Sequence, residues 1–276
     1  MPPFPPMLKL VHWRRRLCVL TASAVLGCSS SKTLAPDPEE IDADIARPEP
    51  GEPHLESIPG PMLGPFDTYS QALFAACRKI FTKPRSSAGR RPPETALREE
   101  QEAFRLRWRV ATEYCAWMYY TPDDKYEISL LTDQSEPNPA GATKRCIPPP
   151  FVEDRRYSPE SIQYIVVLHN HTFDNRISEK DILFLVDQGY LHGFEPKSKD
   201  GNPRLSVVAF FSNEHENPTC DGFYSYAPIA GRILKWTRNG RQWICTQTHI
   251  VKWLKRNSLT EPVVEEEEAP CPMGAP

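Results

Sequence analysis

Two histidines lie one residue apart where a long apolar run ends. In the stretch IVVLHNHTFDNRISEKDILFLV (165–186), His169 and His171 close the first apolar run, and Ser178 and Asp181 open the second. Side chains two residues apart on a strand point to the same face, so the two histidines can approach one ion together. Zinc in catalytic sites takes three His or carboxylate ligands and keeps one position for water. The histidines and Asp181 therefore predict a zinc site.

The same residues resemble a known motif. HNHTFDNRISEKD resembles the JAMM motif of the JAB/MPN metalloproteases, which combines His, any residue, His, a loop, and then Ser, two residues and Asp with an upstream Glu. The resemblance implies that Zn²⁺ binds His169, His171 and Asp181. It also implies that Ser178 stabilises the oxyanion of the tetrahedral intermediate and that Glu113 is the base.

The resemblance covers residues 110–211 and is sharp only at these few positions. Thr172 follows the second His where the family usually has Pro, and the loop before Ser178 is one residue shorter than its commonest form. An alternative explains part of the pattern, because Ser178 and Asp181 also form a capping box at the start of a helix. That alternative accounts for the serine and the aspartate but not for the two histidines.

Glu113 is selected by its place in a predicted strand. The stretch RWRVATEYCAWMYYT (107–121) is rich in β-branched and aromatic residues, which favours a strand. Alternation then places Glu113 on the face of Cys115 and Trp117. A carboxylate on so apolar a face is expected to be buried with a raised pKa, as suits a base near neutral pH. An arginine partner or exposure at a sheet edge are the alternatives, and Glu127 is the second candidate for the base.

The order of predicted elements indicates one α+β domain over residues 67–257. Apolar periodicity predicts helices over 67–83, 94–106 and 179–194, and a short one over 251–257. Strands are predicted over 107–121, 126–133, 161–171, 204–212, 222–228, 231–240 and 241–248. We expect a mixed central sheet flanked by helices, with the continuous apolar run before His169 at its centre. The resemblance implies the JAB/MPN form, a cytidine-deaminase-like sandwich.

The first residues predict export. KLVHWRRRL is positively charged, and CVLTASAVLG (18–27) is apolar but too short to span a bilayer. VLGC (25–28) resembles the bacterial lipobox, which implies a signal peptide over residues 1–27, a lipid on Cys28 and anchoring in the cell envelope. Ser29 resembles the sorting signal for the outer membrane. An ordinary secretory signal and a short membrane anchor are the alternatives.

Proline and acidic residues dominate both flanks of the domain. The chain has 30 prolines against 13 glycines, and residues 28–66 predict a flexible tether. Residues 258–276 contain an EEEE run and predict a disordered acidic tail.

Six cysteines remain outside the signal peptide and Cys28. In an exported chain they predict disulfides, although six cysteines allow fifteen pairings. We favour Cys115 with Cys146, and Cys220 with Cys245. The other two are Cys77 and Cys271.

The net charge and the distribution of basic residues bear on which partners the protein binds. The net charge is -3 and no basic stripe with interleaved aromatics occurs, which argues against a nucleic-acid partner. We expect a lipid-anchored zinc hydrolase that cleaves an amide in a peptide or protein, cell-wall peptides included. The main alternative is a binding lipoprotein that keeps the fold without turnover. An HNH nuclease and a thiol protease of Cys115 and His249 are further alternatives, and the sequence does not indicate the oligomeric state.

Overall fold

The computed structural model describes residues 42–134, 144–199, 201, 203–240, 242–256 and 259–272. The predicted signal peptide (1–27) and the predicted lipidation site Cys28 lie outside these residues. The described helices are α1 (Tyr69–Ile80), α2 (Arg98–Val110) and α3 (Glu179–His192). The strands are β1 (Ile45–Ala46), β2 (Ser57–Gly60), β3 (Leu63–Phe66), β4 (Cys115–Tyr120), β5 (Tyr126–Ile128), β6 (Leu131–Thr132), β7 (Phe151–Asp154), β8 (Gln163–Asn170), β9 (Ser206–Phe211), β10 (Gly222–Ala227), β11 (Arg232–Asn239), β12 (Gln242–Arg256) and β13 (Leu259–Pro270).

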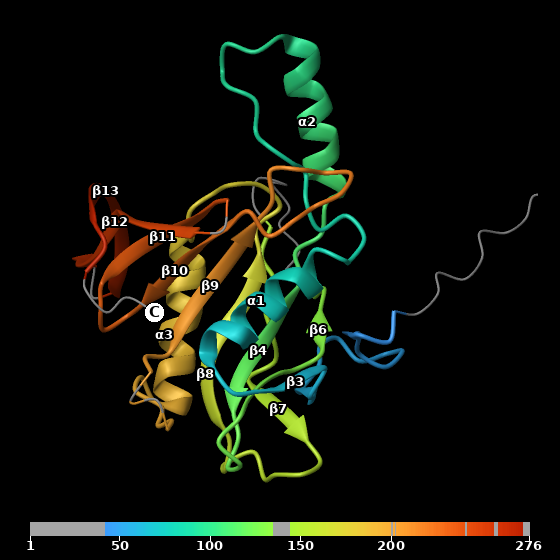
Figure 1. Cartoon of the computed structure of the whole chain (residues 1–276), viewed down its shortest axis with the longest axis vertical. Helices are drawn as coiled ribbons and strands as arrows, with labels where there is room; N and C mark the ends of the chain where they lie inside the picture. Colours follow the sequence, from blue (N-terminus) through green and yellow to red (C-terminus); the bar gives the residue numbers. More distant parts are fainter. Residues whose placement is uncertain are drawn as a thin grey trace, which may run out of the picture. The chain divides into compact units, whose positions relative to one another are not determined.

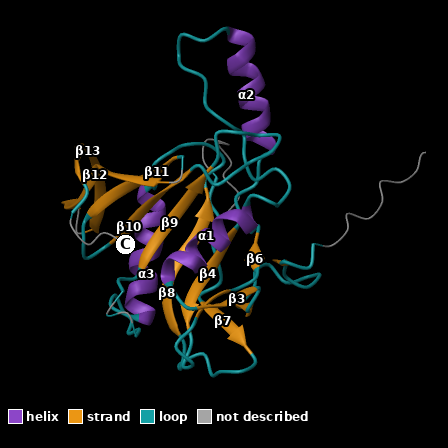
Figure 2. Cartoon of the chain, in the orientation of Figure 1, coloured by secondary structure: helices purple, strands orange, loops and turns teal. Residues whose placement is uncertain are grey.

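A large mixed sheet forms the centre of the domain (Figures 1 and 2), as the sequence predicts. Its main path runs β1-β6-β4-β8-β9-β10-β11-β12-β13, and β8 is antiparallel to β4 but parallel to β9. Helix α1 packs on one face through Leu73, in the same cluster as Leu168. Helix α3 packs on the other face through Ile182, in the same cluster as Val167. The apolar run of β8 is therefore buried on both faces, because each face meets a helix.

Helix α2 differs from the other two because it projects from the end of the sheet (Figure 1). It packs through Phe104 against Ala88 and the ring of Phe173, whose centroid lies 5.5 Å from that of Phe104. The sequence predicts strand from residue 107, but residues 107–110 form the last turn of this helix. The helical spacing of Phe104, Trp108 and Ala111 outweighs the β-branched and aromatic composition, since all three pack in one cluster. Among the helices that the structure describes, none is long and apolar enough to cross a membrane.

The segment before α1 is part of the fold from residue 42 onward, so the predicted tether (28–66) is wrong for residues 42–66. Strand β1 pairs in parallel with β6, β2 pairs in parallel with β7, and Ile58 is fully buried. Lys83 at the end of α1 binds both carboxylate oxygens of Asp42, at 2.9 and 2.8 Å. These strands have two to four residues each. Such short strands show no apolar periodicity in the sequence, and they are stabilised by pairing with strands distant in the chain.

The acidic C-terminal segment also folds over residues 259–272, so the disordered tail predicted over residues 258–276 is wrong for these described residues. Strand β13 pairs antiparallel with β12 along its length, and Lys252 forms an ion pair with Glu265 at 2.5 Å. The exposed glutamates lie on β13 at the edge of the sheet. A charged edge strand can pair with its one neighbour, while its charges discourage pairing with another chain. The short helix predicted over 251–257 is wrong, because residues 251–256 continue β12.

Three disulfides join the described cysteines. The predicted pair Cys115–Cys146 is confirmed, with Cα atoms 5.7 Å apart. The predicted pair of Cys220 with Cys245 is wrong, because Cys220 bonds Cys77 of α1 and Cys245 bonds Cys271 after β13. Cys77 and Cys220 are 143 residues apart in sequence, so their proximity depends on how α1 packs on the sheet.

Candidate metal centre

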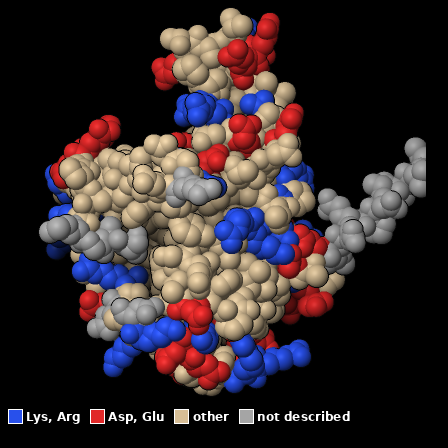
Figure 3. Space-filling view, in the orientation of Figure 1, with Lys and Arg blue, Asp and Glu red and all other residues tan. Residues whose placement is uncertain are grey.

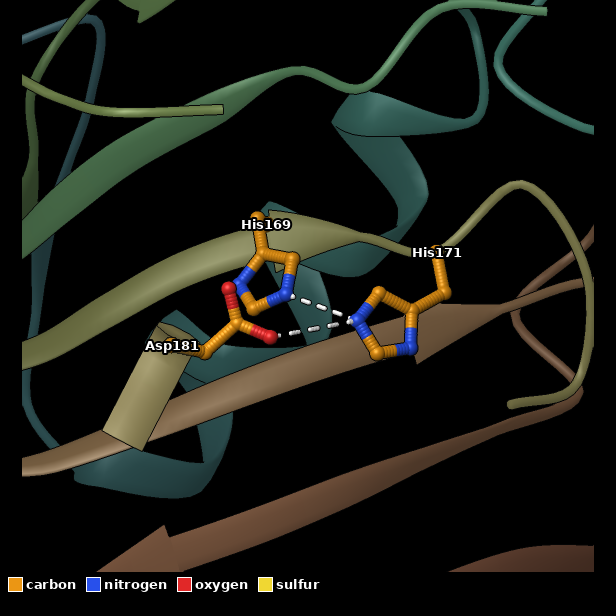
Figure 4. Close-up of side chains that lie close together, drawn as sticks. All are labelled: His169, His171 and Asp181. Carbon is orange, nitrogen blue, oxygen red and sulfur yellow. Dashed lines mark hydrogen bonds and ion pairs between the residues drawn. The ribbon is translucent and has the colours of Figure 1, made fainter. Parts of the chain in front are cut away.

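The two histidines and Asp181 come together where β8 ends and α3 begins. His169 is in β8, and His171 follows the strand, its backbone N–H donating to the carbonyl of Phe210 at 2.8 Å. This bond extends the pairing with β9, so His171 keeps the strand direction. Asp181 lies in the first turn of α3. Figure 4 shows the three side chains facing one another.

The three side chains place their possible ligand atoms close together. His169 Nε2 lies 3.0 Å from His171 Nε2, which lies 3.9 Å from Asp181 Oδ2. The possible ligand atoms all lie within 4.8 Å of one another, and this is the one such His/Cys/Asp/Glu group among the described residues. Two atoms bound to one tetrahedral zinc ion are about 3.3 Å apart. The donor set is therefore one that could hold a metal ion.

Hydrogen bonding sets the orientation of the His171 ring. Its Nδ1 lies 2.7 Å from the carbonyl oxygen of Asn175, which can only accept, so Nδ1 carries a proton and donates. In the neutral ring, Nε2 then presents its lone pair toward His169 and Asp181. Histidines that bind metals usually donate the N–H of the second nitrogen to a carboxylate, a backbone carbonyl or water.

The charges around the three side chains also favour a cation. Burial lowers the pKa of His169 to about 4, so that ring is neutral. Burial also lowers the pKa of His171, but Asp181 and Glu113 outweigh burial and the net direction is upward. Burial alone would raise the pKa of Asp181, yet the two histidines and Ser178 hold it well below its usual range. The cluster therefore contains a carboxylate that stays ionised.

The capping box that the sequence allows is present. The Ser178 hydroxyl accepts from the Asp181 backbone N–H at 3.2 Å and donates to Asp181 Oδ2 at 2.7 Å. Asp181 Oδ2 also accepts from the Ser178 backbone N–H at 2.9 Å. These bonds fix the Asp181 carboxylate beside His171. The capping box and the candidate metal cluster therefore share Asp181.

Glu113 lies in the loop between α2 and β4 and not in the strand that the sequence predicts. Its side chain lines a cavity of about 430 Å³ together with His171, Ser178 and Asp181. The residue is 7% exposed. Burial raises the pKa of Glu113 to about 7, with Asp181 adding to the rise while His171 opposes it. The expected buried carboxyl is found, although a loop positions it.

Asn170 is a site residue that sequence reasoning missed. Its side chain points away from the histidines, as strand alternation predicts, and toward the chain around Glu113. Oδ1 accepts from the Tyr114 backbone N–H at 2.7 Å, and Nδ2 donates to the carbonyls of Thr112 at 3.0 Å and Ser86 at 2.6 Å. Asn170 therefore holds both neighbours of Glu113. A polar residue inside an apolar central strand was the available signal, since buried amides need partners.

Two alternatives from the sequence do not fit this arrangement. Glu127 is buried, but it accepts hydrogen bonds from Tyr119 and Arg156 in a network with Asp154. Cys115 is in a disulfide and is not a free thiol, which removes the nucleophile that a thiol protease needs.

No protein-family model, curated protein or solved structure matches the chain.

Proposed function

We propose that the chain is a zinc-dependent amide hydrolase with a JAB/MPN-like fold, whose metal is held by His169, His171 and Asp181. The observation that carries the proposal is that these three side chains and Glu113 meet at the end of the central strand. Three of the four line one cavity, and His169 lies beside it. The spacing of these residues in the sequence, which resembles the JAMM motif, supports the same proposal.

Each residue has a role that follows from its surroundings. A bound Zn²⁺ would supply Lewis-acid polarisation of a carbonyl and a water of lowered pKa. Glu113, with its pKa raised to about 7, would take a proton from that water and pass it to the leaving amine nitrogen. The Ser178 hydroxyl would donate a hydrogen bond to the developing oxyanion. The amide bond would belong to a peptide or protein substrate, and cell-wall peptides are among the proposed substrates.

A second candidate is a binding protein of the same fold without turnover. One contact favours it, because the Ser178 hydroxyl already donates to Asp181 at 2.7 Å and would have to leave that bond to reach an oxyanion. The two candidates share the metal and differ in catalysis.

We also propose that the protein is exported and anchored by a lipid on Cys28 in the outer membrane of a bacterial envelope. The three disulfides support export, since disulfides persist in oxidising compartments.

Metal analysis of the purified whole chain tests the proposal. Wild type and a His54→Ala control, which alters an exposed histidine, should retain about one zinc ion per chain. His169→Ala should lose most of it while its circular dichroism spectrum is unchanged. Zinc contents that are equal in all three proteins would refute the metal centre.

A panel of peptides then tests catalysis. Wild type should hydrolyse at least one peptide, and Glu113→Gln should keep its zinc while hydrolysis falls by at least about 100-fold. Bound zinc without any cleavage by wild type would favour the binding protein.

A further inference from the structure

The cavity beside the candidate metal centre is lined in part by residues outside that centre. The loop before α2 and α2 itself supply an outer wall, which includes Arg91, Phe104, Arg105 and Trp108. Helix α2 stands off the end of the sheet (Figure 1), and its residues line the same cavity as His171 and Asp181. A peptide that fills this cavity beside the proposed metal would contact this outer wall.

Basic side chains predominate in the cavity lining. They are Arg91, Arg105, Lys144, Arg145, Arg176 and Lys180. The acidic ones are Glu94, Glu113, Glu179 and Asp181. Glu113 and Asp181 belong to the candidate metal centre described above. Glu179 forms an ion pair with Arg176 at 2.9 Å. Glu94, which is exposed, is the remaining acid.

Some of these basic side chains already bind other groups of the protein, and others do not. Lys144 donates to the Arg109 carbonyl at 3.1 Å, and Arg176 binds Glu179. Within the described part of the chain, no side-chain hydrogen bond or ion pair involves Arg91, Arg105 or Lys180. Three cations therefore line the cavity without a side-chain partner among the residues that the structure describes.

A simpler explanation covers part of this pattern. Basic residues in the last turn of a helix stabilise its dipole, and α2 begins with acidic residues and ends with basic ones. Figure 3 shows acidic side chains at the far end of α2 and both basic and acidic ones beside its lower half. The dipole, however, accounts for Arg109 in the last turn of α2 and not for Arg105, which precedes that turn and lines the cavity. It also does not account for Arg91 or Lys180.

We propose that this cavity binds an acidic segment of the substrate peptide, with its carboxylates paired to Arg91, Arg105 and Lys180. The inference rests on the proposed hydrolase function and names its substrate class. Guanidinium groups bind carboxylates through two parallel hydrogen bonds, and an excess of one sign of charge in a cavity lining attracts ligands of the opposite sign. The half-buried ring of Trp108 gives apolar contact area between the charges.

Binding can be measured apart from cleavage. Fluorescently labelled peptides with one Ala-Gly centre, flanked on both sides by Glu, Gln or Lys, are titrated with the Glu113→Gln protein and followed by anisotropy. The Glu peptide should bind at least about tenfold more tightly than the Gln peptide, and the Lys peptide most weakly. Adding Arg105→Ala and Arg91→Ala should remove this preference, and Arg109→Ala is the matched control that should keep it.

The outcomes separate this inference from the proposed function. Equal binding of the three peptides, no measurable binding of the Glu peptide, or an equal effect of Arg105→Ala and Arg109→Ala would overturn the acidic substrate. Wild type that cleaves the Gln and Lys peptides as well as the Glu peptide would also overturn it and leave the hydrolase intact. Preferential binding of the Glu peptide without cleavage by wild type would sustain the cavity's preference and refute the hydrolase.

Discussion

Asn170→Ala should destabilise the protein strongly, although this residue touches no proposed ligand or substrate. Asn170 is fully buried, and its amide makes three hydrogen bonds to backbone groups of residues 86, 112 and 114. Alanine would leave one N–H and two carbonyls without this partner. An unsatisfied buried group costs about 1 to 3 kcal/mol, so we expect a loss of roughly 3 to 5 kcal/mol. Domains of this kind are stable by only about 5 to 15 kcal/mol.

Urea denaturation of the metal-free protein, followed by tryptophan fluorescence, measures this loss without any contribution from bound zinc. Asn217→Ala is the matched control, because Asn217 is exposed in a loop, and it should change the free energy of unfolding by less than about 0.5 kcal/mol. Hydrogen exchange at the Tyr114 amide reports the lost bond directly. A loss below about 1 kcal/mol with Tyr114 still protected would show that the Asn170 bridge does not hold the Glu113 loop.

Three further changes test other parts of the structure. The pKa of Glu113 rises from 4.5 unfolded to about 7 folded, so its contribution to stability is present below pH 4.5 and lost as pH rises through 7. Glu113→Gln should therefore stabilise the metal-free protein by about 3 kcal/mol near pH 9 and very little near pH 4 in urea titrations, and equal effects would contradict this. Replacing Cys115 and Cys146 by Ala removes a link across 31 residues and should cost roughly 4 kcal/mol in the same assay; a loss below about 1 kcal/mol would count against it. Ending the chain at residue 258 removes β13, and the β12 amides facing it should then exchange rapidly; unchanged protection would mean that the two strands are not paired.

The central strand and the helix after it could be predicted because their signals are local. Strand β8 carries an uninterrupted apolar run, and α3 begins at a capping box and ends at Gly193. The convergence of the histidines with Asp181 follows from strand alternation and a short connection. Glu113 could be placed by its apolar neighbours, even though the predicted strand is wrong there, because burial depends on those neighbours more than on backbone type.

The remaining parts depend on contacts that sequence does not display. Strands β1 and β2 have two and four residues, and each pairs with a strand far along the chain. The Cys77–Cys220 bond requires α1 to lie close to the loop between β9 and β10. The Asn170 bridge joins three backbone groups from two loops. Each of these needs the tertiary arrangement before its partners can be named.

The capping box and the metal centre are compatible explanations of Ser178 and Asp181. A carboxylate at the third helical position is stabilised by the positive end of the helix, which adds to the effect of the histidines. The same hydrogen bonds that cap α3 hold Asp181 3.9 Å from His171 in a fixed orientation. The residue would thus be a ligand positioned before any ion arrives, because folding of the helix has already ordered it. Capping alone requires neither the paired imidazoles nor the carbonyl of Asn175 at His171, and the proposed metal site gives both of them a role.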